Sequence, residues 1–220
     1  MQNIICTADK MNNIKNNKYL QKLNEKINLD NFIKSQIYFI AAVDNWSKIL
    51  GIMISKVPSY KERIVLINNL KDEHGEENIN NCHVITFKKF ILSLLEITKK
   101  QEQEYFFKEN KKYINNFING LYELVKQDWI YAISALAMIE YVYINVSESI
   151  HKYISNFIDK NEIHHYSTHE IIDKHHAQEL FSIIEPYYKN NEDIIENGIK
   201  YGYELLNKLY EDLEKYNFTF

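Results

Sequence analysis

The chain has 220 residues, of which 45% are hydrophobic and 25% are charged, and its formal net charge is −4. These values are ordinary for a soluble globular protein, and the acidic balance argues against a nucleic-acid-binding protein. Five glycines and two prolines are too few for a turn-rich β fold, so the composition favours long helices. We expect one domain that spans residues 1–220.

The sequence predicts a cytoplasmic protein. Cys6 and Cys82 are the only cysteines, a usage typical of thiols in a reducing compartment. The amino terminus lacks a basic start followed by a long apolar stretch, so no secretory signal is expected. Residues 129–146 are nearly all apolar and approach the length of a membrane span, with Glu140 as the one charged residue. A central helix of a soluble bundle explains this stretch better, so we expect no membrane partner.

Apolar residues recur at three- and four-residue spacing along almost the whole chain, and no stretch alternates convincingly with period two. This pattern predicts an all-α bundle of seven to eight helices. Start and stop residues such as Ser59 and Gly75 indicate where the helices begin and end. In chain order, the expected helices cover residues 13–27, 28–56, 59–73, 83–100, 101–126, 127–159, 166–186 and 192–216.

Five of the eight histidines lie between residues 164 and 180. His169, Asp173 and His176 stand at helical positions i, i+4 and i+7 and therefore share one face. Ile172 and Leu180 lie on the same face, so we expect it to be buried. Burying an ionised carboxylate without a partner costs several kcal/mol, and a bound metal ion would compensate. The alternatives are a buried His–Asp–His hydrogen-bond network and a solvated face.

The remaining histidines of this cluster are not expected at that face. The helical pattern directs His175 elsewhere, and His164 and His165 are expected to precede the helix.

Other helices supply further metal-ligand types. Glu140 is a lone carboxylate in an apolar helix, Glu73 ends a helix, and His83 begins the next one. Taken singly, each is ordinary as a surface or cap residue. Together with the histidine-rich helix they provide three carboxylates and three imidazoles, a set that suits two iron or manganese ions better than a thiolate-rich structural zinc site. A bridging Glu140 would hold both ions.

A ferritin-like arrangement is the competing pattern. Such di-iron bundles use Glu-x-x-His twice, and the chain offers Glu148 with His151 and Glu162 with His165. The second pair falls in an expected loop, and neither histidine continues an apolar face, so we favour the other ligand set.

Three segments, NNLKDEHG followed by a His, AISALAMIEYVY and HEIIDKHHA, resemble the haem-oxygenase-like di-iron oxidases. They are most similar to the branch of the chlamydial death-domain-associating protein, CADD. The resemblance covers about residues 18–185 and implies a haem-oxygenase-like helical bundle. It also implies two iron ions, or manganese and iron, with dioxygen and an external reductant as co-substrates. TenA thiaminases and PqqC share the fold without this metal set. The implied ligands are Glu73, His83, Glu140, His169, Asp173 and His176.

The CADD-like branch is implied to make p-aminobenzoate for folate biosynthesis from its own tyrosine, which falls here on Tyr19. The lysine expected after the bridging glutamate falls at Ile150, and only Lys152 could replace it. The loop after Glu73 is longer than in the family, which leaves Glu76 as a fallback ligand. An additional glutamate ligand of some relatives has Asp44 as its nearest counterpart.

Two other functions remain open. A di-iron oxidase could instead cleave or desaturate an external amino acid or fatty acid in a pocket lined by aromatic residues of the second helix. A metal-free helical interaction protein could use the tyrosine-rich face of the last helix, which is also a candidate homodimer surface. The residues concerned are Tyr38, Phe39 and Trp46 for the pocket, and Tyr201, Tyr203 and Tyr210 for the contact face.

Overall fold

The structure is a computed structural model. It describes residues 1–25, 28–99, 112–158 and 164–217, without the side chains of 112, 113, 164, 167–171, 216 and 217. All regular elements in these ranges are helical, which confirms the all-α prediction. The α-helices are α1 (Gln2–Met11), α2 (Lys18–Asn24), α3 (Leu29–Lys56), α4 (Tyr60–Glu73), α5 (His83–Thr98), α6 (Lys112–Leu124), α7 (Trp129–Ile154), α8 (His164–Ile184) and α9 (Glu192–Asn217). Short 3-10 helices are η1 (Ile14–Asn16), η2 (Ile79–Asn81) and η4 (Glu185–Asn190).

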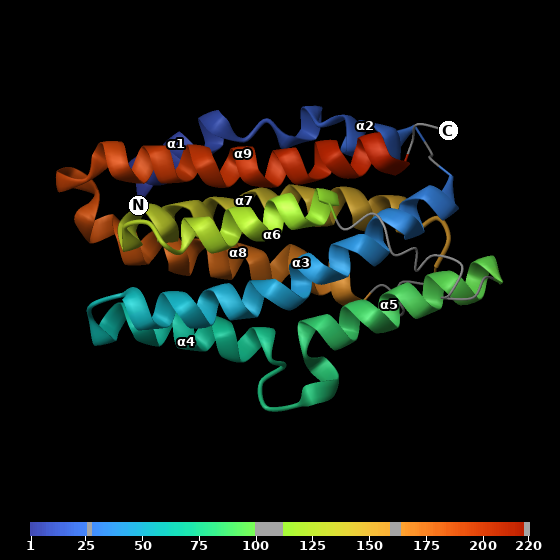
Figure 1. The fold of residues 1–220 in the computed structure, drawn as a ribbon, viewed down its shortest axis with the longest axis horizontal. Coiled ribbons are helices and arrows are strands. Elements are labelled where there is room, and N and C mark those ends of the chain that lie inside the picture. Colours follow the sequence, from blue (N-terminus) through green and yellow to red (C-terminus); the bar gives the residue numbers. More distant parts are fainter. Residues whose placement is uncertain (26–27, 100–111, 159–163, 218–220) are drawn as a thin grey trace.

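The helices form an elongated bundle around α7 (Figure 1). Helix α7 packs mainly against α8 and α9, and α3 packs against α4, α5 and α6. Helices α1 and α2 lie along α9 at one edge, whereas α4 and α5 lie beyond α3 at the opposite edge (Figure 1). Contacts of α4 and α5 with α8 connect the two sides. The ends of α4 and α5 therefore meet α8 near the middle of the bundle.

Helix α7 is the buried core helix that the sequence suggests. By length and composition, α3 and α7 could each span a membrane, but 72% of the most apolar window of α7 is buried inside the bundle. Its contact with α9 is unusually close, because a Cβ atom at Gly202 would lie 2.2 Å from the carbonyl oxygen of Ala135. A side chain larger than hydrogen does not fit there. This close backbone contact fixes the position of α7 relative to α9 near Ala135, about one turn before Glu140.

The amino-terminal helices differ from the prediction of one helix over residues 13–27. The side chain of Asn17 accepts a hydrogen bond from the backbone N–H of Tyr19 and begins α2, so the helix starts later than expected. Helix α1 was not predicted; only Ile4 and Ala8 are buried in it, a weak periodic signal. Helix α6 begins at residue 112 in the described part of the chain, and residues 101–111 of the expected helix 101–126 lie outside it.

The expectation that His164 and His165 precede the histidine-rich helix is wrong. Helix α8 begins at His164, so His165 lies on the helix one turn before His169. Burial of His165 among aromatic rings extends the helix into a stretch whose polar composition suggested a loop.

Candidate metal centre

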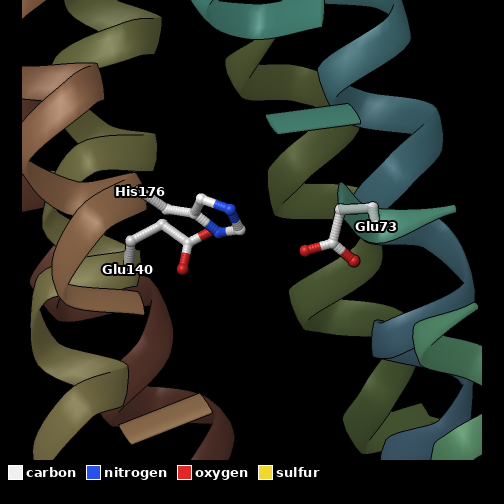
Figure 2. A group of neighbouring side chains, drawn as sticks. All are labelled: Glu73, Glu140 and His176. Atoms are coloured by element: carbon white, nitrogen blue, oxygen red, sulfur yellow. The ribbon is translucent and has the colours of Figure 1, made fainter. Parts of the chain in front are cut away.

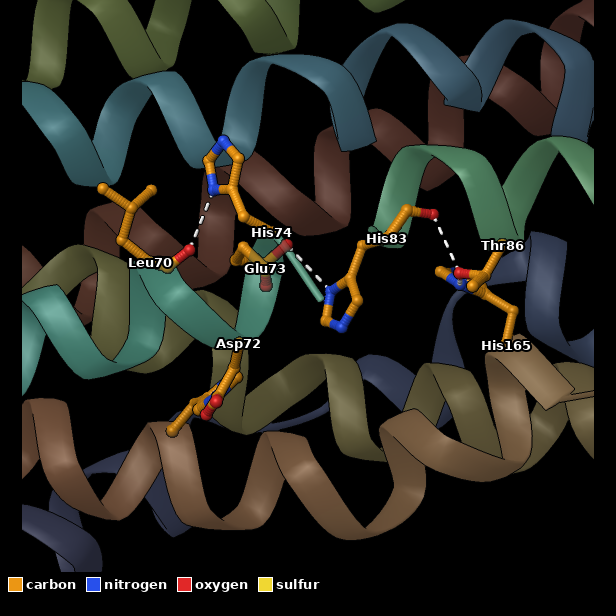
Figure 3. A network of polar contacts seen from close by, with 8 residues as sticks. Leu70, Asp72, Glu73, His74, His83, Thr86 and His165 are labelled. Atoms are coloured by element: carbon orange, nitrogen blue, oxygen red, sulfur yellow. Dashed lines mark hydrogen bonds and ion pairs between the residues drawn. The ribbon is translucent and has the colours of Figure 1, made fainter. Parts of the chain in front are cut away.

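The turn after α4 brings His83 back against Glu73. Gly75 has φ +73, and a Cβ atom there would lie 2.5 Å from the carbonyl oxygen of Asn78 and from the backbone nitrogen of Cys82. A glycine is therefore required for this loop to close. Helix α5 then begins at His83, whose Nδ1 lies 2.8 Å from Oε2 of Glu73 (Figure 3). Both side chains are buried.

Glu140 lies in the middle of α7 and is buried. Burial raises its pKa well above the usual value, the charges of Asp173 and Glu73 raise it further, and a hydrogen bond with Trp46 opposes these effects. Its Oε1 atom has no hydrogen-bond partner among the described residues. A buried carboxylate oxygen without a partner is costly, so this atom is available to a cation.

Helix α8 contributes Asp173 and His176, both buried, as their shared helical face predicts. Burial raises the pKa of Asp173 well above the usual value, and the charge of Glu73 adds to this effect. Burial lowers the pKa of His176 below the usual 6.5, although Glu73 and Asp72 oppose the shift. Nδ1 of His176 has no hydrogen-bond partner among the described residues. His175 points away from this face, as predicted, and 67% of its side chain is exposed.

Three of these side chains converge from three helices. Ligand atoms of Glu73, Glu140 and His176 all lie within 4.8 Å of one another. Figure 2 shows Glu140 and His176 side by side, with the carboxylate of Glu73 facing them from α4. Two carboxylates and an imidazole are ligand types that suit iron and manganese. The unpaired atoms of Glu140 and His176 therefore fit a metal ion.

Of these three side chains, Glu73 and Glu140 are among the described residues that line a cavity of about 60 Å³, which is room for a few water-sized molecules. Its polar wall includes Glu73, His83, Glu140 and Asp173, so the structure brings these four predicted ligands to one cavity. The rest of the wall is largely apolar and comes from α3, α6, α7 and α9. These lining residues are Phe39, Ala42, Val43, Trp46, Phe117, Ile139 and Leu206.

The structure places the other ligand candidates differently. The side chain of His169 lies outside the described part, although its backbone belongs to α8 one turn before Asp173. Glu76, the fallback ligand, is exposed in the loop after α4. Asp44 is exposed and pairs with Lys48 on the surface of α3. Neither Glu76 nor Asp44 belongs to the described wall of the cavity.

Of the ferritin-like candidates, only His165 is among the described residues that line the cavity. Glu148 is exposed and lies 3.8 Å from Lys15 on the surface. Glu162 lies outside the described residues. His165, its predicted partner, instead lines the cavity together with His83.

The predicted catalytic residues do not line this cavity. Tyr19 is fully buried on α2, where its hydroxyl lies 2.7 Å from Oγ of Ser35 and accepts a hydrogen bond from Gln36 at 3.0 Å. Lys152 is exposed near the end of α7, whereas Ile150 is fully buried. A direct role for Tyr19 or Lys152 at the cavity would require a path or a movement through the bundle.

Two polar residues of the cavity wall were not predicted at this site. Nδ1 of His165 lies 3.3 Å from Oγ1 of Thr86, and its ring meets that of His83 edge-on. Spacing could have revealed His165, because it lies one turn before His169 on the same helical face. Tyr143 follows Glu140 by one turn on α7 and stacks on Phe39 at 5.9 Å. With 17 tyrosines in the chain, no sequence signal distinguished it.

The aromatic expectations are partly met. Phe39 and Trp46 line the cavity, and Tyr38 is not among the described lining residues. On α9, Tyr210 is fully buried and the hydroxyl of Tyr201 donates to the carbonyl of Gly120. Tyr201 and Tyr203 are half-buried, so a homodimer contact on this face stays a prediction.

A helical bundle that gathers carboxylates and imidazoles from facing helices into its core belongs to the class of carboxylate–histidine metalloproteins. The model of a family described as iron-containing redox enzymes matches residues 36–204. That range covers more than half of the chain, so the chain belongs to this family, and the match supports the haem-oxygenase-like fold. Tyr19 precedes the matched range. No curated protein matches the chain.

Proposed function

We propose that this iron-containing redox enzyme holds two iron ions, or a manganese and an iron ion, and uses dioxygen with an external reductant. The observation that carries the proposal is the convergence of Glu73, Glu140 and His176 within 4.8 Å. Asp173 and His83 at the same cavity, with His169 on the same helix as Asp173, extend the ligand set toward two ions. Bound iron would supply the redox chemistry by passing electrons from the reductant to dioxygen.

In this proposal, residues of the chain hold the ions, balance their charge and limit the access of water. Glu140, at the centre of the core helix, would help to hold the ions, and the carboxylates of Glu73 and Asp173 would balance their charge. Phe39 and Trp46 form an apolar wall that limits the access of water. His165 and Tyr143 add polar groups to the wall. The cavity of about 60 Å³ leaves room beside these candidate ligands for an oxidant as small as dioxygen.

The finer proposal is that the oxidised target is an internal tyrosine and that the product is p-aminobenzoate. The resemblance to the CADD-like branch motivates it, and the small cavity supports an internal target over a long-chain acid. Tyr19 is connected to the cavity by a buried polar chain: Gln36 donates to Tyr19, Tyr166 donates to Gln36, and Tyr143 hydrogen-bonds to Tyr166. Tyr19 and Tyr143 are therefore the two internal tyrosines to compare.

The stoichiometry of iron binding tests the metal proposal. We would load the metal-free chain anaerobically with ferrous iron and measure bound iron for the wild type, His169→Ala and His175→Ala. Two ions per wild-type chain and clearly fewer in His169→Ala are expected. His175→Ala is the matched control, because it removes an exposed histidine from the same helix. Failure of the wild type to bind iron tightly would overturn the proposal and favour a metal-free helical protein.

A further inference from the structure

The two ring nitrogens of His176 have different surroundings. Nε2 lies 3.2 Å from Oδ2 of Asp72, whereas Nδ1 is buried and has no hydrogen-bond partner among the described residues. The imidazole belongs to the convergent group with Glu73 and Glu140 (Figure 2). A neutral imidazole carries its proton on one nitrogen and offers the lone pair of the other to a metal. A hydrogen bond at one nitrogen therefore decides which nitrogen can bind.

We propose that Asp72 is a positioning residue that holds His176 in the Nε2–H tautomer and leaves Nδ1 to bind iron beside Glu73 and Glu140. Asp72 itself does not reach the metal in this arrangement. The tautomer follows from the hydrogen-bond surroundings of the two ring nitrogens. The assignment of Nδ1 as the iron ligand rests on the proposed function.

The end of α4 provides both a candidate ligand, Glu73, and the positioning residue, Asp72. Asp72 and Glu73 are consecutive helical residues, so their side chains leave the helix about 100° apart. Glu73 turns toward His83 and the cavity, whereas Asp72 turns toward α8, against which α4 packs (Figure 3). One helical turn thus provides a candidate ligand and a support for a ligand on another helix.

Burial distinguishes this pair from an ordinary surface contact. His175 and Glu179 form a pair of the same kind on α8, with Nε2 of His175 also 3.2 Å from the carboxylate. His175 is 67% exposed, so water can replace the carboxylate there. The side chain of His176 is 0% exposed and that of Asp72 is 32% exposed. The imidazole of His176 therefore depends on Asp72 for a hydrogen bond at Nε2, while the carboxylate stays in contact with water.

The first test is the tautomer of His176 in the metal-free protein. Nitrogen NMR of histidine-labelled protein at pH 8, with His176→Gln for assignment, should show Nε2–H in the wild type. Asp72→Ala should move His176 toward a mixture of tautomers. Asp72→Asn should preserve Nε2–H, because an amide oxygen can still accept the hydrogen bond. Glu179→Ala is the matched control and should leave His176 unchanged. An Nδ1–H tautomer in the wild type, or an unchanged tautomer in Asp72→Ala, would overturn the inference.

The second test is the dissociation constant for ferrous iron, measured anaerobically on the same variants. Loss of an outer hydrogen-bond partner of a metal ligand typically weakens metal binding about 10- to 100-fold. We expect a loss of that size in Asp72→Ala, a smaller loss in Asp72→Asn, and none in Glu179→Ala. Wild-type affinity in Asp72→Ala would overturn the role of Asp72 in metal binding. If the wild type binds no iron while the tautomer follows Asp72, the proposed function fails and the positioning of His176 stands.

Discussion

Nδ1 of His83 lies 2.8 Å from Oε2 of Glu73, across the loop that joins α4 to α5. These two predicted ligands therefore contact each other. The closed loop holds a carboxylate and an imidazole side by side, which lowers the cost of ordering them as ligands.

Glu73→Gln should remove most of the iron affinity. The substitution preserves the size of the side chain but removes the charge that faces Glu140 and His176. We expect the dissociation constant for ferrous iron to rise by at least about 100-fold, the upper end of the loss found for outer-shell partners. Glu76→Gln, in the exposed loop nearby, should bind like the wild type. If Glu73→Gln and Glu76→Gln lost the same iron affinity, the loss would come from a disturbed loop and not from the carboxylate of Glu73.

Glu140 should destabilise the metal-free protein at neutral and alkaline pH. Its pKa is raised well above 4.5 by burial, so the folded state retains a proton that the unfolded chain releases. The stability that this group contributes is fully present below about pH 4.5 and is lost as the pH rises toward the raised pKa. Glu140→Gln should therefore increase the free energy of unfolding at pH 8, by about 1.4 kcal/mol for each tenfold difference between the folded and unfolded acid dissociation constants.

The same substitution should have little effect at pH 5. Urea unfolding of chelator-treated protein at both pH values checks this, with the exposed Glu148→Gln on the same helix as the control. Ferrous iron should raise the unfolding midpoint of the wild type and not that of Glu140→Gln. A variant less stable than the wild type at pH 8 would contradict the assigned effect of burial.

Gly202→Ala and Gly51→Ala should have opposite effects on stability. A Cβ atom at Gly202 would lie 2.2 Å from the carbonyl oxygen of Ala135, whereas at Gly51 it would meet nothing within 4 Å. We expect Gly202→Ala to lower the free energy of unfolding by about 2 kcal/mol or more, because two backbones must separate. Gly51 is itself exposed within α3, so Gly51→Ala should gain up to about 1 kcal/mol. Thermal unfolding measures both, and a stable Gly202→Ala would mean that α7 and α9 are less closely packed.

Oxidation of an internal tyrosine should be visible in the intact mass of the polypeptide. After aerobic turnover with iron and reductant, we expect a mass change that maps to the peptide with Tyr19 and that is absent in Tyr19→Phe. Tyr143→Phe tests whether the cavity tyrosine is the oxidised residue or part of the path to Tyr19. Tyr153→Phe, another buried tyrosine, is the control. An unchanged polypeptide with no released aminobenzoate would indicate an external substrate.

The sequence by itself determined the helical class and the chemical type of the candidate site. Three- and four-residue periodicity predicted most helices, and the common face of Asp173 and His176 correctly predicted that both are buried. Glu140 was recognisable because a lone carboxylate in an apolar helix needs compensation. These inferences succeed because helical periodicity is a local property that reports which face is buried.

Only the tertiary structure decided which side chains meet. From the sequence, Asp72 is expected to be a surface residue at the end of a helix. The residues around it in the sequence do not indicate that its carboxylate lies 3.2 Å from the imidazole of His176. The burial of His165 in the cavity wall and the separation of Tyr19 from it also depend on how α2, α3 and α8 pack. Such relationships are set by close contacts between helices distant in the chain, as at Gly202 and Ala135. Periodicity carries no information about those contacts, because it does not specify the partner of a buried face or the register in which the two helices pack.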